Sequence, residues 1–430
     1  MPSSITAPEG QLSRRDKFRA YMQAFNPTAP AFDVIQAGLV VEDLHRSLYR
    51  NLAARADLEP GSRQLLVGGV GSGKTTELLL AIRWTEEHAN LLPFYFDISE
   101  DTDLSTMTSG VLLASSAVRL GLYALKGPGS NSRIDERANK LEKNFDRAMD
   151  FAYGTEVERE VNRLYSDAFV SGPLTFQPGS ERRVVVDRIP GKLNPPLPAL
   201  ERDIRAMQAP ISEFMCAIRE ATQKDVVVIF DGLDRLLDAN KFWSVVYQDL
   251  RILRDLKVSV IATAPLSVLF GVGIGQSISD HFDKVHHLTV IPADPVDASL
   301  WSVLLKRGGI ELLSAPLPSV LCAYSGGVLR DLISLARDAA EEAYVADRDS
   351  ITLADIEKVA HQLGNSYLRG LGPEAIQTLL KLESTKSIDL NQAANVELLL
   401  TRRVLEYSST DFRVHPALLS VIPRPEPTRA

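Results

Sequence analysis

A glycine-rich stretch in the first fifth of the chain constrains the fold more than any other feature. It reads Gly68, Gly69, Val70, Gly71, Ser72, Gly73, Lys74 and Thr75, which fits the pattern Gly-x-x-x-x-Gly-Lys-Ser/Thr. The mainly apolar residues 64–67 before it predict a strand, and residues 76–82 after it predict a helix. In such a strand–loop–helix unit, backbone N–H groups and the helix N-terminus point at one phosphate cluster.

Each part of this loop therefore has an expected role in binding a nucleoside triphosphate. The glycines let the backbone fold around the phosphates, and Thr76 continues the phosphate-binding stretch into the helix. Lys74 would reach the β- and γ-phosphates, and the Thr75 hydroxyl would hold Mg²⁺. The alternative is a glycine-rich turn that matches by chance, which the flanking strand and helix disfavour.

Length and composition set limits on the rest of the molecule. With 430 residues, the chain is expected to form two or three domains. A net charge of −8 gives no global positive field for nucleic acid, although a local basic patch stays possible. The only cysteines, Cys216 and Cys322, lack metal-ligand spacing and are expected to be buried free thiols. Without a signal-like N-terminus or a membrane-length apolar run, the chain is expected to be cytoplasmic, with no membrane partner.

Four more apolar segments predict strands that alternate with helices. They are residues 92–98, 226–231, 258–263 and 285–291. Such alternation predicts an α/β fold, namely a P-loop NTPase parallel sheet with helices on both faces, followed by a helical lid and a winged-helix domain.

The domain boundaries follow from the positions of helices, prolines and glycines. A helix over 13–25 precedes a proline-rich link, and a helix over 39–54 places Leu44, Leu48 and Leu52 on one face. Four helices over 295–364, then helix–turn–helix and a hairpin around residues 408–411, complete the chain. The expected domains are an N-terminal helical extension (1–38), a P-loop nucleotide-binding domain (39–294), a helical lid (295–370) and a winged-helix domain (371–424).

An inserted arm at about 126–205 interrupts the predicted sheet. Residues 132–165 predict a charged helix with interleaved Leu141, Phe145, Met149 and Phe151, and residues 171–198 are rich in Pro and Gly. Two interpretations stay open: a solvated helix with a loose return, or a surface for a partner or for self-assembly.

Asp231 ends the β-branched strand 226–231, where a carboxylate can reach Mg²⁺ beside Thr75. This is the Walker B position. Many ATPases of this architecture place a water-polarising glutamate next, whereas Gly232 follows here. The first candidate for the catalytic base is therefore Asp234, before Asp97 and then Glu77, although either aspartate could instead cap a helix.

Further candidates lie beyond the two motifs. Thr263 ends the strand at 258–263 and could contact the γ-phosphate or the attacking water, or it could simply close the turn before Pro265. Arg330 begins a helix of the predicted lid and could reach the γ-phosphate. Arg251 or Arg254 could act as an arginine finger on a neighbouring subunit.

Together these features resemble the STAND branch of AAA+-like ATPases, with a secondary likeness to initiator-type AAA+ proteins. The likeness rests on residues 68–75, 226–234 and 326–330, on Thr263 and on the winged helix. It implies ATP and ADP as ligands with Mg²⁺, slow or partner-stimulated hydrolysis, and a switch that controls self-assembly or a separate effector protein. A role in bacterial defence or signalling is the further implication.

In STAND proteins, the histidine of a winged-helix Met-His-Asp motif contacts the β-phosphate of ADP. His415 in Val414-His415-Pro416 lies at the comparable place, which implies this role, but both neighbours depart from the motif. A structural histidine is the alternative. Val328 also replaces the proline of the STAND lid, so Arg330 resembles a sensor 2 arginine instead.

Two other functions compete with the switch. The first is a DNA-handling AAA+ ATPase of initiator or transposition-regulator type, whose winged helix would contact phosphates through Lys386, Arg402, Arg403 and Arg413. The second is a binding scaffold whose site holds nucleotide without turnover, for which Gly232 is the only support.

Overall fold

The computed structural model describes residues 13–126, 136–153, 201–270, 274–293, 299–308 and 311–423. The chain forms two compact units. The sheet unit comprises His45–Leu288 and Asp389–Leu400, and the helical unit comprises Met1–Leu44, Thr289–Ile388 and Thr401–Ala430. Among the described residues, no helix is long and apolar enough to span a lipid bilayer.

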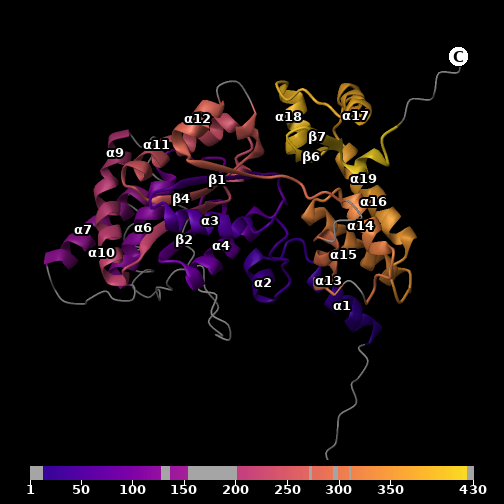
Figure 1. The fold of residues 1–430 in the computed structure, drawn as a ribbon, viewed down its shortest axis with the longest axis horizontal. Coiled ribbons are helices and arrows are strands. Elements are labelled where there is room, and N and C mark those ends of the chain that lie inside the picture. Colours follow the sequence, from indigo (N-terminus) through magenta and orange to yellow (C-terminus); the bar gives the residue numbers. More distant parts are fainter. Residues whose placement is uncertain are drawn as a thin grey trace, which may run out of the picture. The chain divides into compact units, whose positions relative to one another are not determined.

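A five-stranded parallel sheet forms the centre of the sheet unit (Figure 1). Its order, β2-β3-β4-β1-β5, places β4 between the strand that leads into the glycine-rich loop and the strand that ends at Asp231. The strands are β1 (Arg63–Gly68), β2 (Leu91–Asp97), β3 (Asp225–Asp231), β4 (Ser259–Ala264) and β5 (Lys284–Leu288). Because all five run parallel, their carboxyl ends share one edge of the sheet.

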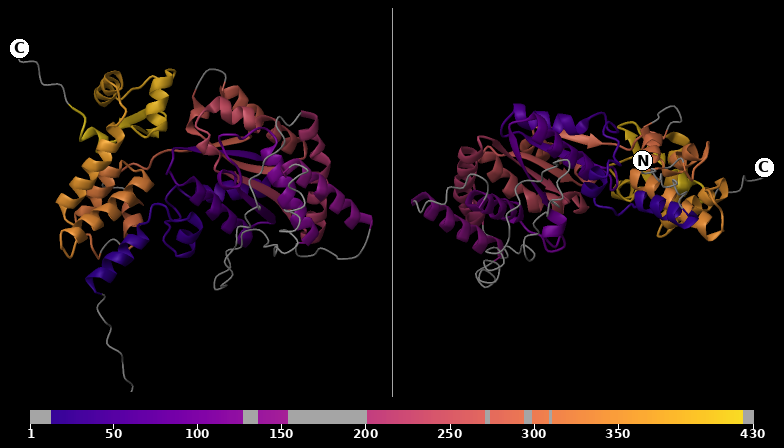
Figure 2. Two further views of the ribbon diagram at one scale, coloured as in Figure 1. Left: turned by 180° about the vertical axis from the view of Figure 1, so that it is seen from behind. Right: turned by 90° about the horizontal axis from the view of Figure 1, so that it is seen from below.

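Helices cover both faces of this sheet (Figure 2). Every residue of β4, and all but the first of β1 and β3, is buried, as expected for strands covered on two sides. The predicted α/β P-loop fold is confirmed. The helices of the unit are α3 (Leu48–Leu58), α4 (Lys74–His88), α5 (Ile98–Asp101), α6 (Val111–Lys126), α7 (Glu136–Tyr153), α9 (Glu201–Ala206), α10 (Gln208–Thr222), α11 (Ala239–Asp255), α12 (Ile274–His281) and α18 (Ala393–Leu400), with 3₁₀ turns η1 (Leu233–Arg235) and η2 (Leu266–Leu269).

Two boundaries differ from the prediction. The helix expected over 39–54 begins only at Leu48, because Arg46 and Ser47 have left-handed backbones with φ of 53° and 59°. Strand β5 ends at Leu288 rather than at residue 291. Beyond it, the Val290 N–H donates to the Glu406 carbonyl within the helical unit, so this backbone is paired elsewhere.

The described part of the inserted arm packs inside the sheet unit. The apolar side chains of α7 contact α6 and α10, and Leu141, Phe145, Met149 and Phe151 are all buried. These four side chains are therefore core residues of the sheet unit, and the partner or self-assembly surface expected for the arm as a whole stays a prediction. The rest of the arm, residues 154–200 with the Pro- and Gly-rich part, lies outside the described residues.

The helical unit combines the N-terminal extension with the predicted lid. Phe18, Tyr21 and Phe25 of α1 join the same hydrophobic core as Leu332 and Leu335 of α15. The four helices predicted over 295–364 are present, and the last has the predicted capping box between Thr352 and Asp355. The elements are α1 (Arg14–Ala24), α2 (Ala31–Gln36), α13 (Ser299–Lys306), α14 (Leu317–Ser325), α15 (Leu329–Val345), α16 (Leu353–Leu368), α17 (Pro373–Thr385), β6 (Val404–Ser408), β7 (Asp411–Val414) and α19 (Pro416–Leu419).

The C-terminal elements follow the predicted order. Helices α17 and α18 precede the antiparallel hairpin β6–β7, and α17 packs on β7. Helix α18 belongs to the sheet unit, where it contacts η2. The helix–turn–helix and hairpin elements are confirmed, whereas the winged-helix assignment stays a prediction.

The two cysteines differ from each other. Cys322 is buried as expected, and burial raises the pKa of its thiol to about 11. The expectation of a buried Cys216 is wrong, because the exposed side of the amphipathic helix α10 carries it.

Candidate functional site

The glycine-rich loop follows β1 and turns into α4. Gly71 and Gly73 have φ of 83° and 100°, a region in which a side chain would be strained. A Cβ on Gly68 would lie 2.9 Å from both the Leu288 carbonyl and the Ser72 hydroxyl, so this position also requires glycine. Gly69 has open space around it. The loop thus reaches the N-terminus of α4, as a phosphate-binding loop must.

Lys74 is buried at the first position of α4, and all three donors of its ammonium group have partners. Its Nζ donates to the carbonyls of Gly68 at 2.8 Å and Gly69 at 2.9 Å, and it lies 2.9 Å from Oδ2 of Asp234. An ammonium group has three donors. A phosphate oxygen can therefore bind Lys74 only by replacing one of these partners.

Asp231 lies at the end of β3 with only 3% of its surface exposed. Its carboxylate accepts hydrogen bonds from the Thr75 hydroxyl, from the Tyr95 hydroxyl at 2.9 Å and from the Gly232 N–H at 2.7 Å. Burial raises the pKa of Asp231 above its ordinary value, and the nearby Asp234 raises it further, against these hydrogen bonds.

This arrangement fits a divalent cation. No described lysine, arginine or histidine forms an ion pair with the buried Asp231, although the Thr75 hydroxyl lies beside it. The described residues contain no cluster of three or more His, Cys, Asp or Glu side chains that could hold a metal alone. Mg²⁺ does not require such a cluster, because it commonly takes one or two protein ligands together with waters and substrate phosphates.

Gly232 explains why no glutamate follows Asp231. Its φ of 81° is left-handed, and an added Cβ would lie 2.8 Å from Oδ1 of Asp97 and 3.0 Å from the backbone N of Ser99. Any side chain here is therefore both strained and obstructed. A catalytic base must come from elsewhere in the site.

The three candidate bases have different surroundings. Asp234 lies on η1, partly exposed, and pairs with Lys74. Asp97 caps α5, accepting from the Ser99 N–H at 3.1 Å and the Ser99 hydroxyl at 2.5 Å. Glu77 is buried and accepts from the Tyr49 N–H at 2.9 Å, which ties α4 to α3. Asp97 and Glu77 thus have structural tasks, and Asp234 is the carboxylate in contact with the P-loop lysine.

Thr263 lies in β4, near the carboxyl edge of the sheet. Its buried hydroxyl is 3.5 Å from the Phe230 carbonyl, and its backbone pairs with Leu66 of β1. Arg251 and Arg254 are exposed on α11, the latter 3.6 Å from Asp255. The roles predicted for these residues stay predictions.

Two side chains of the site had no signal in the sequence. Tyr95 donates to Asp231 from the neighbouring strand β2, and burial raises its pKa well above the ordinary value. His45 hydrogen-bonds the backbone of Ser72, and burial lowers the pKa of its ring to about 4, so the ring is neutral at pH 7. An aromatic residue in a buried strand and a histidine in an expected helix both look unremarkable.

His415 and Arg330 lie in the helical unit. Arg330 is exposed at the second position of α15. His415 is fully buried and caps α19: its Nδ1 accepts from the Ala417 N–H at 3.2 Å, and its Nε2 lies 3.2 Å from Oδ2 of Asp331. Both ring nitrogens are engaged, which favours the structural alternative for His415.

Asp331 is the centre of this buried polar cluster. It also accepts from the Tyr367 hydroxyl at 2.6 Å and from Arg402 at 2.8 Å. Burial alone would raise the pKa of Asp331, but the hydrogen bond from His415 and the charge of Arg402 outweigh it and lower the pKa. The cluster joins α15, α16 and the segment around the hairpin.

The four basic residues considered for DNA phosphates all have partners inside the helical unit. Lys386 pairs with Glu383, and Arg413 pairs with Asp411. Arg402 pairs with Asp331, and Arg403 donates to the carbonyls of Tyr367 and Arg369. Each of these four side chains therefore already has a partner within the helical unit.

No protein-family model and no curated protein matches the chain. Among solved structures, it is similar to Drosophila ORC bound to DNA, with 12% identity, 89% of this chain and 77% of that chain covered, and a TM-score of 0.41. It is also similar to the Aeropyrum pernix ORC1 protein in complex with DNA (14% identity, 90% and 95% covered, TM-score 0.41) and to Cdc6p from Pyrobaculum aerophilum (11%, 93% and 96%, 0.38). These values are too low to place the chain in a family.

Proposed function

We propose that the sheet unit binds ATP with Mg²⁺ and hydrolyses it slowly. One observation carries this proposal. The loop, Lys74, Thr75, Asp231 and Asp234 converge at the carboxyl ends of β1 and β3, and the buried Asp231 has no described cationic partner. This is the donor set that phosphoryl transfer requires of a P-loop protein.

Each side chain has a defined task in the proposed reaction. The loop N–H groups and Lys74 bind the phosphates, with a phosphate oxygen taking the place of Asp234 at Nζ. Thr75 and Asp231 would hold Mg²⁺, which supplies charge neutralisation at the phosphate oxygens when bound. Asp234, released from Lys74, orients a water and accepts its proton. Thr263 would hydrogen-bond the γ-phosphate or that water.

The helical unit would make the nucleotide a switch. In the STAND-like version, Arg330 contacts the γ-phosphate, His415 contacts ADP, and the nucleotide controls assembly of copies of this chain or activation of an effector protein in the cytoplasm. Such a switch requires that ATP and ADP bind two states with different affinities. The support for this switch is the resemblance in sequence. Because both ring nitrogens of His415 already have partners, we favour a version of the switch in which Arg330 alone contacts the nucleotide.

The first test is to denature the purified protein and identify the nucleotide that it releases. We expect ADP at close to one equivalent per chain, and none from Lys74→Ala. Size-exclusion chromatography with ATP and with ADP then measures assembly. If Lys74→Ala bound ATP and assembled like the parent protein, the proposed function would be wrong.

A DNA-handling ATPase is the second candidate, and the contacts above decide how to test it. Arg402→Ala or Arg403→Ala would disturb the fold, because both side chains stabilise the helical unit. Lys386→Ala with Arg413→Ala removes two exposed charges instead, and Lys381→Ala on α17 is the matched control. A salt-sensitive shift of duplex DNA that only the double variant weakens would favour this candidate; no shift at low salt would eliminate it.

A further inference from the structure

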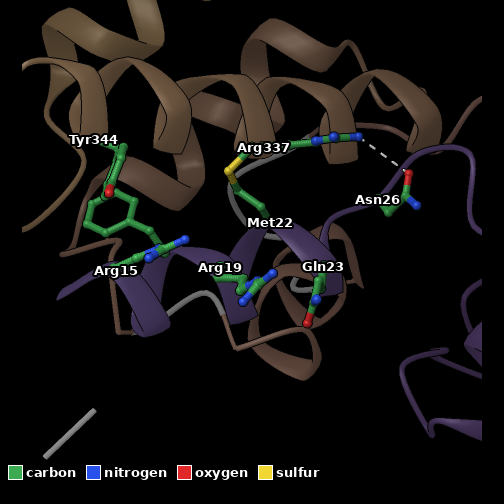
Figure 3. A pocket seen from close by; sticks show the side chains of 8 residues that line it. Arg15, Arg19, Met22, Gln23, Asn26, Arg337 and Tyr344 are labelled. Atoms are coloured by element: carbon green, nitrogen blue, oxygen red, sulfur yellow. Dashed lines mark hydrogen bonds between the residues drawn. The ribbon is translucent and has the colours of Figure 1, made fainter. Parts of the chain in front are cut away.

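A pocket of about 430 Å³ lies between α1 and α15 within the helical unit (Figure 3). Residues at helical spacing on one side of α1, among them Arg15 and Arg19, form one wall, and Arg337 and Tyr344 of α15 form the other. In Figure 3, Arg15 lies near Tyr344 at one end, and Arg337 reaches toward Asn26 at the other. No role assigned above uses this pocket.

Three guanidinium groups line the pocket from one end to the other, and none forms an ion pair with a described carboxylate, although the charge of Arg337 acts on the neighbouring Asp338. Arg15 and Arg19 form no ion pair or hydrogen bond with a described side chain, and the one hydrogen bond of the Arg337 side chain to a described residue is a long contact of 3.4 Å with Asn26. The preceding residue, Arg14, behaves differently. It donates to the carbonyls of Tyr344 and Arg348 and pairs with acidic residues. The same helix thus carries one structural arginine and two whose donors stay available.

The pocket also has a flat apolar wall. Phe18 is buried beneath it, and the Tyr344 ring, 38% exposed, lies 5.4 Å from the Phe18 ring. The Arg14 guanidinium backs the Tyr344 ring at 4.5 Å and restricts its position. A fixed aromatic surface next to guanidinium forks suits a ligand that combines a planar ring with phosphate.

The surrounding charges favour a small ligand over a polymer. Asp338 and Glu341 are exposed on α15 next to the pocket arginines, and the nearly fully exposed Asp347 and Asp349 follow the helix. A long polyanion would meet these carboxylates, whereas a small anion can contact the arginines alone. The volume falls in the range of small-molecule sites.

We propose that this pocket binds a small phosphate-bearing ligand with a planar ring, of the nucleoside monophosphate class. The site is independent of the P-loop and does not rest on ATP hydrolysis. Arg19, with Arg337 at the Asn26 end, binds the phosphate, and the Tyr344 ring beside Arg15 contacts the base. The bound ligand thus contacts both α1 and α15.

The test is calorimetric titration of the full-length Lys74→Ala protein with AMP, because this variant removes the P-loop lysine. We expect one AMP per chain. Adding Arg19→Ala should weaken binding about tenfold or more, since it removes a charge-assisted contact. Lys17→Ala, an exposed cation on the same helix outside the pocket, is the matched control and should leave the affinity unchanged.

Three results would overturn the proposal: no saturable AMP binding, equal losses from Arg19→Ala and Lys17→Ala, or displacement of AMP by duplex DNA. The parent protein separates this proposal from the previous one. If both proteins bind one AMP and the parent protein binds one ATP more than Lys74→Ala does, both sites exist. AMP binding that Arg19→Ala weakens, without any ATP binding that depends on Lys74, would leave the pocket and eliminate the P-loop function, whereas no AMP binding to Lys74→Ala would eliminate the pocket alone.

Discussion

Two buried aspartates, one in each unit, show how the same residue type can serve chemistry or stability. Asp231 and Asp331 each accept hydrogen bonds from a tyrosine hydroxyl and from further donors. Asp331 also has Arg402 and His415, and its pKa is lowered. Asp231 has only neutral donors and the anionic Asp234 nearby, and its pKa is raised.

The difference is the counter-charge. A buried carboxylate whose positive partner belongs to the protein is satisfied, and it stabilises the fold. One without such a partner is destabilising in its charged form unless a cation arrives from outside. By this criterion Asp331 is a structural anchor, whereas the surroundings of Asp231 support its proposed role as a metal ligand. The sequence singled out only Asp231.

The largest effect is expected from Asp331→Asn. Removing the charge leaves Arg402 without its anion in a largely buried site, which should destabilise the helical unit by about 3–5 kcal/mol. Urea unfolding followed by hydrogen exchange would report the loss unit by unit. Asp338→Asn on the exposed side of α15 is the control and should change little. Equal stability of Asp331→Asn and the parent protein would remove the distinction between the two aspartates.

Asp234→Asn tests the chemistry beside Asp231. As the proposed base, Asp234 should contribute about 10²–10⁴-fold to turnover. The variant also loses its charge against Lys74, so the KM for ATP should stay the same or fall while kcat falls. Asp97→Asn is the comparison, because it alters the rival carboxylate. A larger loss of kcat from Asp97→Asn would move the assignment of the base to Asp97.

Gly232→Glu asks whether the missing glutamate can be restored. The left-handed backbone should cost about 1–2 kcal/mol, and contact with Asp97 and Ser99 adds to it. We therefore expect lower stability of the sheet unit and no gain in turnover. Gly232→Ala separates backbone strain from the effect of the carboxylate. Faster hydrolysis by Gly232→Glu would show that the backbone adapts and that Asp234 is not required as the base.

Local patterns in the sequence were enough to predict the sheet, the glycine-rich loop and the position of Asp231 at the end of β3. The loop, the strand before Asp231 and the four helices after residue 295 each have a motif or a periodicity of their own. Tyr95, His45 and Asp331 were missed because their roles depend on partners far away in the chain, Asp231, Ser72 and Arg402. The helix start at Leu48 was missed because two left-handed residues outweigh an apolar period.

The smallest effect is in the pH dependence, where the two aspartates should act with opposite sign. The pKa of Asp331 is lowered on folding, so its stabilisation is complete above the unfolded-state pKa of about 3.9 and is lost as the pH falls through the folded value. The pKa of Asp231 is raised, so its contribution to stability is complete below the unfolded-state pKa and is lost as the pH rises through the folded-state pKa.

At neutral pH, Asp231→Asn should therefore be at least as stable as the parent protein in the absence of Mg²⁺ and nucleotide, whereas Asp331→Asn is less stable. Both differences should shrink as the solution is acidified. Free energies of unfolding of the three proteins between neutral and acidic pH measure this, and a destabilised Asp231→Asn at neutral pH would mean that the hydrogen bonds to Asp231 already compensate its buried charge.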